Sequence, residues 1–278
     1  MKLKIGAVLT AAAGGGLFFA VAPNGDKTRR RRLRVFQCRR FAHRGLHDRE
    51  SGVPENSLAA FEKAADAGYG IELDVRLTKD GIPIVIHDEN TMRVCGADHV
   101  VADTSFAELR ALTLSGSEEK IPSFEEALER INGRVPLIIE VKNGHDTAAI
   151  CPAVMRKLYL YPGFYCVQSF SPFVLKWFRD HEPNVLRGQL SFDFFEPTYD
   201  RGEAWPVKFA ASYLVENVLS RPDYIAYDIH SRSSLPLIVN RKWFGTPFAS
   251  WTVRSRTEME EADDRGDIVI FEGFLPEK

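Results

Sequence analysis

Residues 70–88 read GIELDVRLTKDGIPIVIHD, two extended segments separated by the turn Thr78-Lys79-Asp80-Gly81. The Asp-Gly pair supplies the backbone freedom that a tight hairpin needs. Glu72 and Asp74 are two residues apart on the first segment, so the alternation of a strand directs both carboxylates to one face. Two carboxylates in an apolar run repel each other and are costly to bury unless a cation lies between them. We therefore expect a hard divalent cation here, either Mg²⁺ or Ca²⁺.

The chain around this stretch alternates between apolar extended runs and amphipathic helical runs from about residue 39 onward. A length of 278 residues with 45% hydrophobic composition is compatible with one αβ barrel or with two smaller domains. Eight strand segments are predicted when the return arm of the hairpin is left out, which favours a TIM (β/α)8 barrel over residues 39–278 with a small insertion at about 78–120. The segments are one ending at 41–45, then 70–77, 136–141, 165–170, 185–190, 224–229, 248–253 and 268–271.

Two helices carry clear start signals. The run 57–68 begins after Asn56 or Ser57, either of which can cap it, and stops at Gly68. The run 122–129 contains Ser123 and Glu126 in the spacing of a capping box. Both helices fit the αβ alternation of a barrel, in which the residues at the carboxyl ends of the strands are the functional ones.

Polar and charged residues stand at several of these strand ends. Glu140 and Lys142 alternate onto one face of a neighbouring strand, so Glu140 is able to join Glu72 and Asp74 in an oxygen cage for the metal. The alternative is that Glu140 and Lys142 form only a structural ion pair with each other. The sequence leaves both interpretations open.

Two histidines are candidates for acid and base catalysis. His43 follows the first strand and His87 closes the return arm of the hairpin, so both are placed near the carboxylate face. Two imidazoles beside a metal suit cleavage of a phosphate ester, because one removes a proton from the attacking oxygen and the other protonates the leaving alcohol. Arg44 adds a planar fork for two phosphate oxygens.

The N-terminal region differs from the rest of the chain. Residues 5–22 are uncharged and just long enough to cross a bilayer, so residues 1–24 are predicted to be a membrane anchor, and the arginine-rich residues 25–38 a basic juxtamembrane linker. The positive-inside rule then places the catalytic domain on the cytoplasmic face of the cell membrane as a single-pass protein. A cleaved signal peptide, giving a secreted enzyme, is the alternative. A formal net charge of −2 indicates no nucleic-acid partner, and four cysteines without a Cys-x-x-Cys spacing argue against a zinc knuckle.

Together the ordered motifs resemble the glycerophosphodiester phosphodiesterase family over about residues 39 to 273. The resemblance implies a TIM barrel and metal-dependent hydrolysis of a glycerophosphodiester to glycerol 3-phosphate and an alcohol. It also implies that Glu72, Asp74 and Glu140 bind the metal and that His43 and His87 are the acid and base. The remaining implied residues contact phosphate or substrate or support the site, and they are Arg44, Lys142, Glu55, Asn56 and Trp251. The motifs are His43-Arg44-Gly45, Pro54-Glu55-Asn56-Ser57, Glu72-Leu73-Asp74-Val75, Lys79-Asp80-Gly81, Ile86-His87-Asp88, Glu140-Val141-Lys142 and Trp251-Thr252-Val253.

The chain departs from the family pattern in two places. The last strand ends Phe271-Glu272-Gly273 where the family has Thr-Asp and then Pro, and residues 92–95 lack the usual Arg-Thr pair. We expect neither departure to touch the metal or histidine positions. The aromatic run at 192–195 could hold a lipid tail, so the sequence does not fix the substrate. One alternative is therefore a lysophospholipase-D-like enzyme that acts on lysolipids at the membrane. A catalytically inactive barrel that binds a lipid or a partner is the other.

Overall fold

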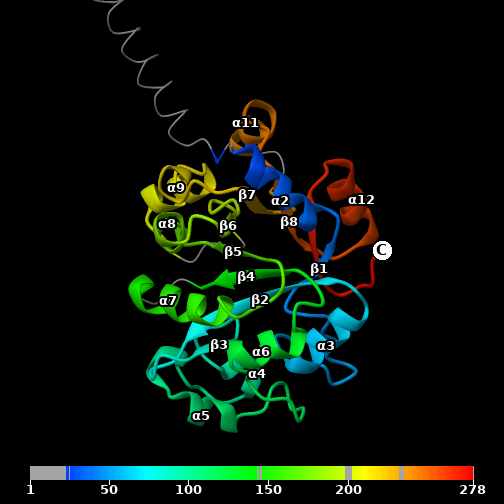
Figure 1. The fold of residues 1–278 in the computed structure, drawn as a ribbon, viewed down its shortest axis with the longest axis vertical. Helices are drawn as coiled ribbons and strands as arrows, with labels where there is room; N and C mark the ends of the chain where they lie inside the picture. The colour runs from blue at the N-terminus through cyan, green and yellow to red at the C-terminus, as the bar shows by residue number, and fades with distance from the viewer. Residues whose placement is uncertain are drawn as a thin grey trace, which may run out of the picture.

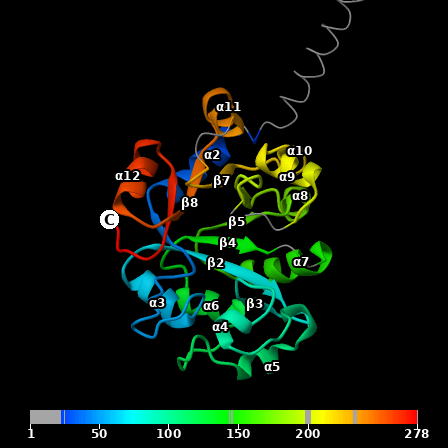
Figure 2. The same ribbon diagram turned by 180° about the vertical axis from the view of Figure 1, so that it is seen from behind.

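The barrel in the computed structural model is closed by parallel strands. The structure describes residues 23–277 apart from 25, 143, 145, 198–201 and 232–234. The strands pair in the order β1-β9-β8-β7-β6-β5-β4-β2, and a parallel pairing of β1 with β2 closes the ring (Figures 1 and 2). The predicted TIM barrel and its eight strands are therefore confirmed. The strands are β1 (Arg40–Ala42), β2 (Gly70–Leu77), β4 (Leu137–Val141), β5 (Tyr165–Ser169), β6 (Leu186–Ser191), β7 (Tyr224–Asp228), β8 (Phe248–Val253) and β9 (Ile268–Phe271).

Helices cover the outside of this barrel. Ser57 caps the first of them through its side chain, and Ser123 and Glu126 form the predicted capping box at the start of another. The helices between the barrel strands are α3 (Leu58–Asp66), α6 (Phe124–Ile131), α7 (Thr147–Leu158), α8 (Pro172–His181), α9 (Trp205–Ser212), α10 (Asn217–Ser220), α11 (Leu235–Phe244) and α12 (Arg256–Asp264).

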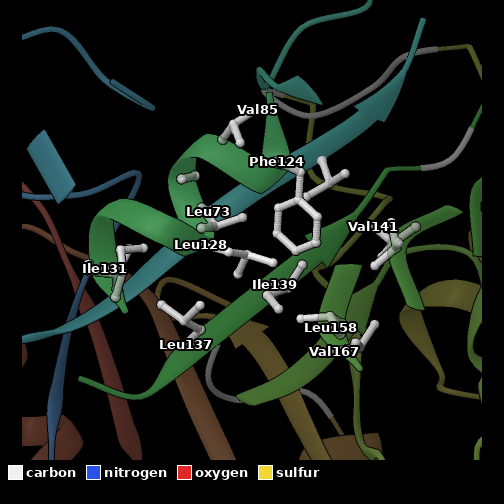
Figure 3. Packing of buried hydrophobic residues seen from close by; sticks show 14 of the residues in the cluster. Leu73, Val85, Phe124, Leu128, Ile131, Leu137, Ile139, Val141, Leu158 and Val167 are labelled. Atoms are coloured by element: carbon white, nitrogen blue, oxygen red, sulfur yellow. The ribbon is translucent and has the colours of Figure 1, made fainter. Parts of the chain in front are cut away.

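The main hydrophobic core lies between the barrel and these helices. Leu73 and Ile139 project outward from β2 and β4 and meet Phe124 and Leu128 of α6 (Figure 3). Because neighbouring strand residues alternate, outward Leu73 requires Glu72 and Asp74 to project into the barrel. The apolar packing on the outside therefore fixes the direction of the carboxylates inside.

The hairpin and the insertion form a small unit beside the barrel. Strand β3 (Pro83–Val85) pairs antiparallel with β2, with Val85 opposite Val75. The chain then forms the helices α4 (Met92–Cys95), η1 (Val101–Asp103) and α5 (Phe106–Ala111) before it returns to α6. This unit has its own buried cluster, which includes Ile84, Leu109 and Ile121. Its packing holds the end of β3, and hence His87, against the barrel.

The basic segment differs from the linker that the sequence predicts. Residues Lys27–Gln37 form helix α2, which Asp26 caps through its side chain. Leu33 and Phe36 of α2 are buried with the interior residues at the amino ends of the strands, and Phe36 stacks on Phe41 at 5.8 Å between ring centroids. The run of arginines predicts a solvated linker. Leu33 and Phe36, three residues apart, instead form an apolar face of α2 that covers the end of the barrel where the strands begin.

The predicted anchor at residues 1–24 lies, apart from Pro23 and Asn24, outside the described residues. Within the described part of the chain, no helix combines the length and the apolar character needed to cross a bilayer.

One glycine inside the barrel allows a testable prediction about stability. Gly188 of β6 is the register partner of Tyr224 of β7, and a Cβ atom at Gly188 would lie 2.2 Å from the tyrosine ring. Gly188→Ala is therefore expected to lower the free energy of unfolding by about 1–3 kcal/mol through overpacking. Chemical denaturation measures this value. The same substitution in a Tyr224→Leu background is expected to cost less, and an equal cost in both backgrounds would contradict the explanation.

Candidate active site

Three buried carboxylates meet inside the barrel at the carboxyl ends of two neighbouring strands. Asp74 of β2 is the register partner of Glu140 of β4, and Glu72 precedes Asp74 on the same face. One oxygen from each of the three carboxylates lies within 4.8 Å of the other two. The structure therefore brings together the three metal ligands that the sequence predicts.

Cations already surround these carboxylates. Lys142 Nζ lies 2.6 Å from Glu140 Oε1 and 3.0 Å from Asp74 Oδ1, and Arg44 Nε lies 3.4 Å from Asp74 Oδ2. Burial favours the neutral form of Asp74, but the charge of Lys142 and the other nearby cations outweighs it and holds the pKa of Asp74 well below its usual range. Burial, together with the charges of Asp74 and Glu140, raises the pKa of Glu72 well above its usual range. The ionised form of Glu72 therefore lacks sufficient compensation from the cations present.

The donor set fits a divalent metal ion. All three groups offer carboxylate oxygens, the ligands that Mg²⁺ and Ca²⁺ prefer, and oxygens on opposite sides of a bound Ca²⁺ are up to about 5 Å apart. Lys142 pairs with two of the three carboxylates, so the ion pair with Glu140 that the sequence left open is present together with the cage. Lys142 is itself buried and does not line the cavity beside the carboxylates, so its predicted contact with phosphate stays a prediction.

His43 lies directly after β1 and is oriented by the last strand. Its Nδ1 contacts Oε2 of Glu272, while its Nε2 lies 3.9 Å from Glu72 Oε2. Burial disfavours the ionised form of Glu272, but the hydrogen bond with His43 outweighs this effect and holds the pKa of Glu272 far below its usual range. Glu272 therefore accepts the proton of Nδ1, which leaves Nε2 facing the carboxylates.

This contact corrects the expectation that the departure at the last strand does not touch the histidines. Glu272 is the hydrogen-bond partner of His43, and Arg254 donates to the other carboxylate oxygen of Glu272 from Nε at 3.0 Å and from Nη2 at 2.9 Å. The signal in the sequence is the position of Glu272 at a strand end. Its partner lies 229 residues away along the chain, so no local pattern reveals the pair.

Loss of Glu272 is expected to disorient His43 without removing it. Glu272→Ala should lower kcat by about 100-fold, because a misplacement of a catalytic group by 1 Å has a cost of that order. Glu272→Asp keeps the acceptor and should restore part of the loss. Steady-state kinetics on both variants test this, and an unchanged kcat in Glu272→Ala would refute the positioning role.

His87 reaches the same cavity from the return arm of the hairpin. The backbone N–H of Ile86 donates to Asp74 O at 3.1 Å, which ties the return arm of the hairpin to β2. His87 Nδ1 lies 2.6 Å from Asp88 Oδ1, and Arg76 Nε donates to His87 O at 2.8 Å. The two predicted histidines both line a cavity of about 220 Å³ together with Glu72 and Glu140.

Two loops hold the remaining polar residues in place. Arg44 and Asn56 both have left-handed backbone conformations, with φ of 56° and 55°, and Asn56 N donates to Arg44 O at 2.9 Å. Asn56 Nδ2 donates to Asp74 Oδ2 at 2.8 Å, and Arg44 Nη1 donates to Glu55 Oε1 at 2.8 Å. Asn56 and Glu55 therefore orient a metal-site carboxylate and the arginine fork, which agrees with the supporting place expected for them.

The second departure from the family pattern also touches the site. Arg93 donates to both oxygens of Glu55 at 2.7 Å and to Asp88 Oδ2 at 2.6 Å. Burial disfavours the ionised form of Glu55, but the bonds from Arg93 and the charge of Arg44 outweigh this and lower the pKa of Glu55 to about 2. Arg93 thus connects the partner of Arg44 with the partner of His87, a role that sequence reasoning missed.

Aromatic side chains form one wall of the cavity. Trp251 packs edge-to-face with Phe170 at 5.7 Å between ring centroids, and Phe192 lies beside both. Trp251 therefore lies where the sequence places a wall of the substrate pocket. A larger hollow of about 1280 Å³ runs along α3 and the C-terminal residues, but none of the three carboxylates lines it.

Comparisons with known proteins agree with this geometry. The model of the glycerophosphoryl diester phosphodiesterase family matches residues 43–271. A glycerophosphodiester phosphodiesterase of Caldanaerobacter subterraneus is 30% identical over 79% of this chain and 87% of its own length. Human glycerophosphodiester phosphodiesterase 1 is 34% identical, but the match covers 52% of this chain and 46% of the human protein.

A solved structure shows the same fold. An Oleispira antarctica phosphodiesterase, in complex with the product sn-glycerol-3-phosphate, superimposes with a TM-score of 0.68 at 23% identity, covering 84% of this chain and 92% of its own. The family match includes the three clustered carboxylates and both histidines. Among the residues that orient them, Glu272 lies just beyond the end of the match. The chain therefore belongs to the glycerophosphoryl diester phosphodiesterase family.

Proposed function

We propose that this protein hydrolyses glycerophosphodiesters to glycerol 3-phosphate and an alcohol with the help of a divalent metal ion. The observation that carries the proposal is the convergence of the metal-site carboxylates Glu72 and Glu140 with both histidines on one cavity. Family membership supports the same reaction, as does the product named for the Oleispira antarctica structure. An inactive binding barrel has no need of this combination of groups.

The side chains divide the work by charge. Glu72, Asp74 and Glu140 would hold the metal, proposed as Mg²⁺ or Ca²⁺, which would supply positive charge to the phosphate oxygens. Arg44 faces the same cavity and offers its fork to the phosphate, while Lys142 balances the excess charge of the carboxylates. These cations stabilise the additional negative charge that develops on the phosphate in the transition state.

The two histidines account for the protons. The attacking hydroxyl, of water or of the glycerol moiety, loses its proton to one imidazole as the new P–O bond forms, and the other imidazole protonates the leaving alkoxide as the old P–O bond breaks. Attack by water gives glycerol 3-phosphate directly, whereas attack by the glycerol hydroxyl gives a cyclic phosphate that water must then open. Glu272 keeps Nε2 of His43 toward the site, and Asp88 holds Nδ1 of His87. Either histidine is placed for either role, and a substrate with a good leaving group separates the two directions of transfer.

Release of glycerol 3-phosphate from glycerophosphocholine tests the proposal. We expect the enzyme to be active with Mg²⁺ or Ca²⁺. The activity should be lost when a chelator is added and should return when the metal is added back. Comparison of the two metals identifies the preferred one. Turnover that is indifferent to the chelator, or no release of glycerol 3-phosphate with either metal, would overturn the assignment.

A lysolipid is the second candidate substrate, favoured by aromatic residues around the cavity. Phe192, at the cavity wall, stacks on Phe194 with 3.9 Å between ring centroids, and Trp205 lies 65% exposed farther along the same region. Such residues are able to hold an acyl chain. A higher kcat/KM for lysophosphatidylcholine than for glycerophosphocholine would favour this candidate.

The proposed location is the cell membrane, with residues 1–24 as a single-pass anchor and the barrel on the cytoplasmic side. The uncharged run at 5–22 and the arginines that follow it support this location. Intact full-length chain in the soluble fraction would contradict the anchor. Loss of the N-terminal residues from exported protein would instead favour the secreted form.

A further inference from the structure

Helix α2 is fixed at the end of the barrel opposite the active-site cavity. Its Arg29 is held on the neighbouring elements, with Nη2 donating to Val185 O at 2.7 Å and to Asp223 Oδ2 at 2.6 Å. Arg30 Nη2 donates to Phe244 O at 2.8 Å, which ties α2 to the end of α11 (Figures 1 and 2). These partners precede the strands β6, β7 and β8, so α2 lies at the amino ends of the strands, whereas the cavity lies at their carboxyl ends.

The outward side of α2 carries cations that have no counter-ion in the described part of the chain. Lys27, Arg31 and Arg34 follow one another at spacings of four and three residues, which places them on one side of the helix, away from buried Leu33 and Phe36. All three are exposed, and none has an ion-pair partner among the residues that the structure describes. Like charges at this spacing repel each other, so the helix gains from an anionic partner.

Exposed aromatic side chains lie at the same end of the barrel as these cations. Trp243, which precedes the residue bonded by Arg30, is 74% exposed, and Phe164, at the start of β5, is 66% exposed. Arg32 Nη1 reaches Asn184 O at 2.7 Å, on the loop before β6, and β6 is the neighbour of β5. We call the surface made by Lys27, Arg31, Arg34, Phe164 and Trp243 the basal face.

We propose that the basal face docks on an anionic lipid bilayer, so that the active-site cavity opens away from that bilayer. Cations combined with exposed aromatic residues match a headgroup region that carries negative charge above an apolar interior. The position of the preceding chain gives the same direction. The uncharged run 5–22 leads directly into Pro23, which is buried, and Asn24 N donates to Pro222 O just before β7.

This orientation has a consequence for the substrate. A cavity that opens away from the bilayer receives molecules from the aqueous phase, which favours water-soluble glycerophosphodiesters over lysolipids held in the same membrane. The competing surface is on the cavity side, where Trp205 and Phe209 stack at 5.3 Å between ring centroids and Phe209 stacks on Tyr213. The inference rests on the proposed membrane association but not on the proposed reaction.

Tryptophan quenching in the full chain distinguishes the two orientations. The full chain is reconstituted through its N-terminal anchor into vesicles of phosphatidylcholine, with or without phosphatidylserine, that contain a spin-labelled headgroup lipid, so that only docking of the barrel on the bilayer varies. We expect tryptophan fluorescence to be quenched when phosphatidylserine is present and the quenching to weaken at high salt. The quenching should be lost in Trp243→Phe and should persist in Trp205→Phe. Arg31→Gln with Arg34→Gln should weaken the docking constant by about 30-fold, since each arginine at such a surface contributes about a fivefold factor.

The matched control removes two positive charges from another side of the barrel. Arg49→Gln with Lys63→Gln should leave the quenching unchanged. Three results would overturn the proposal. The quenching could disappear in Trp205→Phe instead, it could be equal without phosphatidylserine, or it could be unaltered by the double substitution of Arg31 and Arg34. Binding of the basal arginines to duplex DNA in preference to the vesicles would also overturn it. Because no readout is an activity, failure here is distinct from failure of the proposed reaction.

Discussion

Glu72→Gln is expected to lower kcat for glycerophosphodiester hydrolysis by about a thousand-fold or more, because charge stabilisation by a metal ion amounts to several kcal/mol in such reactions. The amide has the same shape as the carboxylate but is a neutral and weaker ligand. Burial and its two acidic neighbours raise the pKa of Glu72 well above its usual range, so its ionised form should depend strongly on the metal. Steady-state kinetics across a range of metal concentrations measure the loss.

The stability of the same variant should change in the opposite direction when no metal is present. A pKa that is raised in the folded state means that Glu72 stabilises the fold below its unfolded pKa and that this stabilisation is lost as the pH rises through the folded value. The glutamine cannot ionise, so metal-free Glu72→Gln should melt at a higher temperature than metal-free wild type at neutral pH. It should also gain less from added metal. A lower melting temperature without metal, or an unchanged response to metal, would contradict the metal-site assignment.

His43→Ala and His87→Ala are each expected to lower kcat by about 10²–10⁴-fold, the usual contribution of a positioned acid or base. Both imidazoles line the cavity, and each is oriented by a carboxylate, Glu272 for His43 and Asp88 for His87. The double variant should lose much less than the product of the two single losses, since groups that act together are not additive. His99→Ala, an exposed histidine of the insertion, is the matched control.

A substrate with a good leaving group assigns the two roles. A p-nitrophenyl phosphodiester needs little protonation of its leaving oxygen, so the variant that lacks the general acid should recover most of its activity on that substrate. The variant that lacks the base should remain impaired on both substrates. Wild-type activity of either histidine variant on glycerophosphocholine would remove that residue from the mechanism.

Short-range sequence patterns predict the strands and helix caps of this protein but not the packing of helix α2. Eight strands, the helix caps and the inward direction of Glu72, Asp74 and Glu140 follow from spacings of two to four residues, and the structure confirms all of them. Helix α2 was missed because two apolar residues among many arginines look like a solvated segment until the open end of a barrel is available to bury them.

Strand periodicity in the sequence predicts the barrel and the shared inward face of Glu72 and Asp74, because alternation decides which side chains share a face. The contacts that orient the site residues depend instead on closure of the barrel. Glu272 reaches His43 because β9 closes the ring beside β1, and Arg93 reaches Glu55 because the insertion folds over the cavity. Contacts between residues far apart in the chain depend on closure and register of the whole barrel, which no short stretch of sequence specifies.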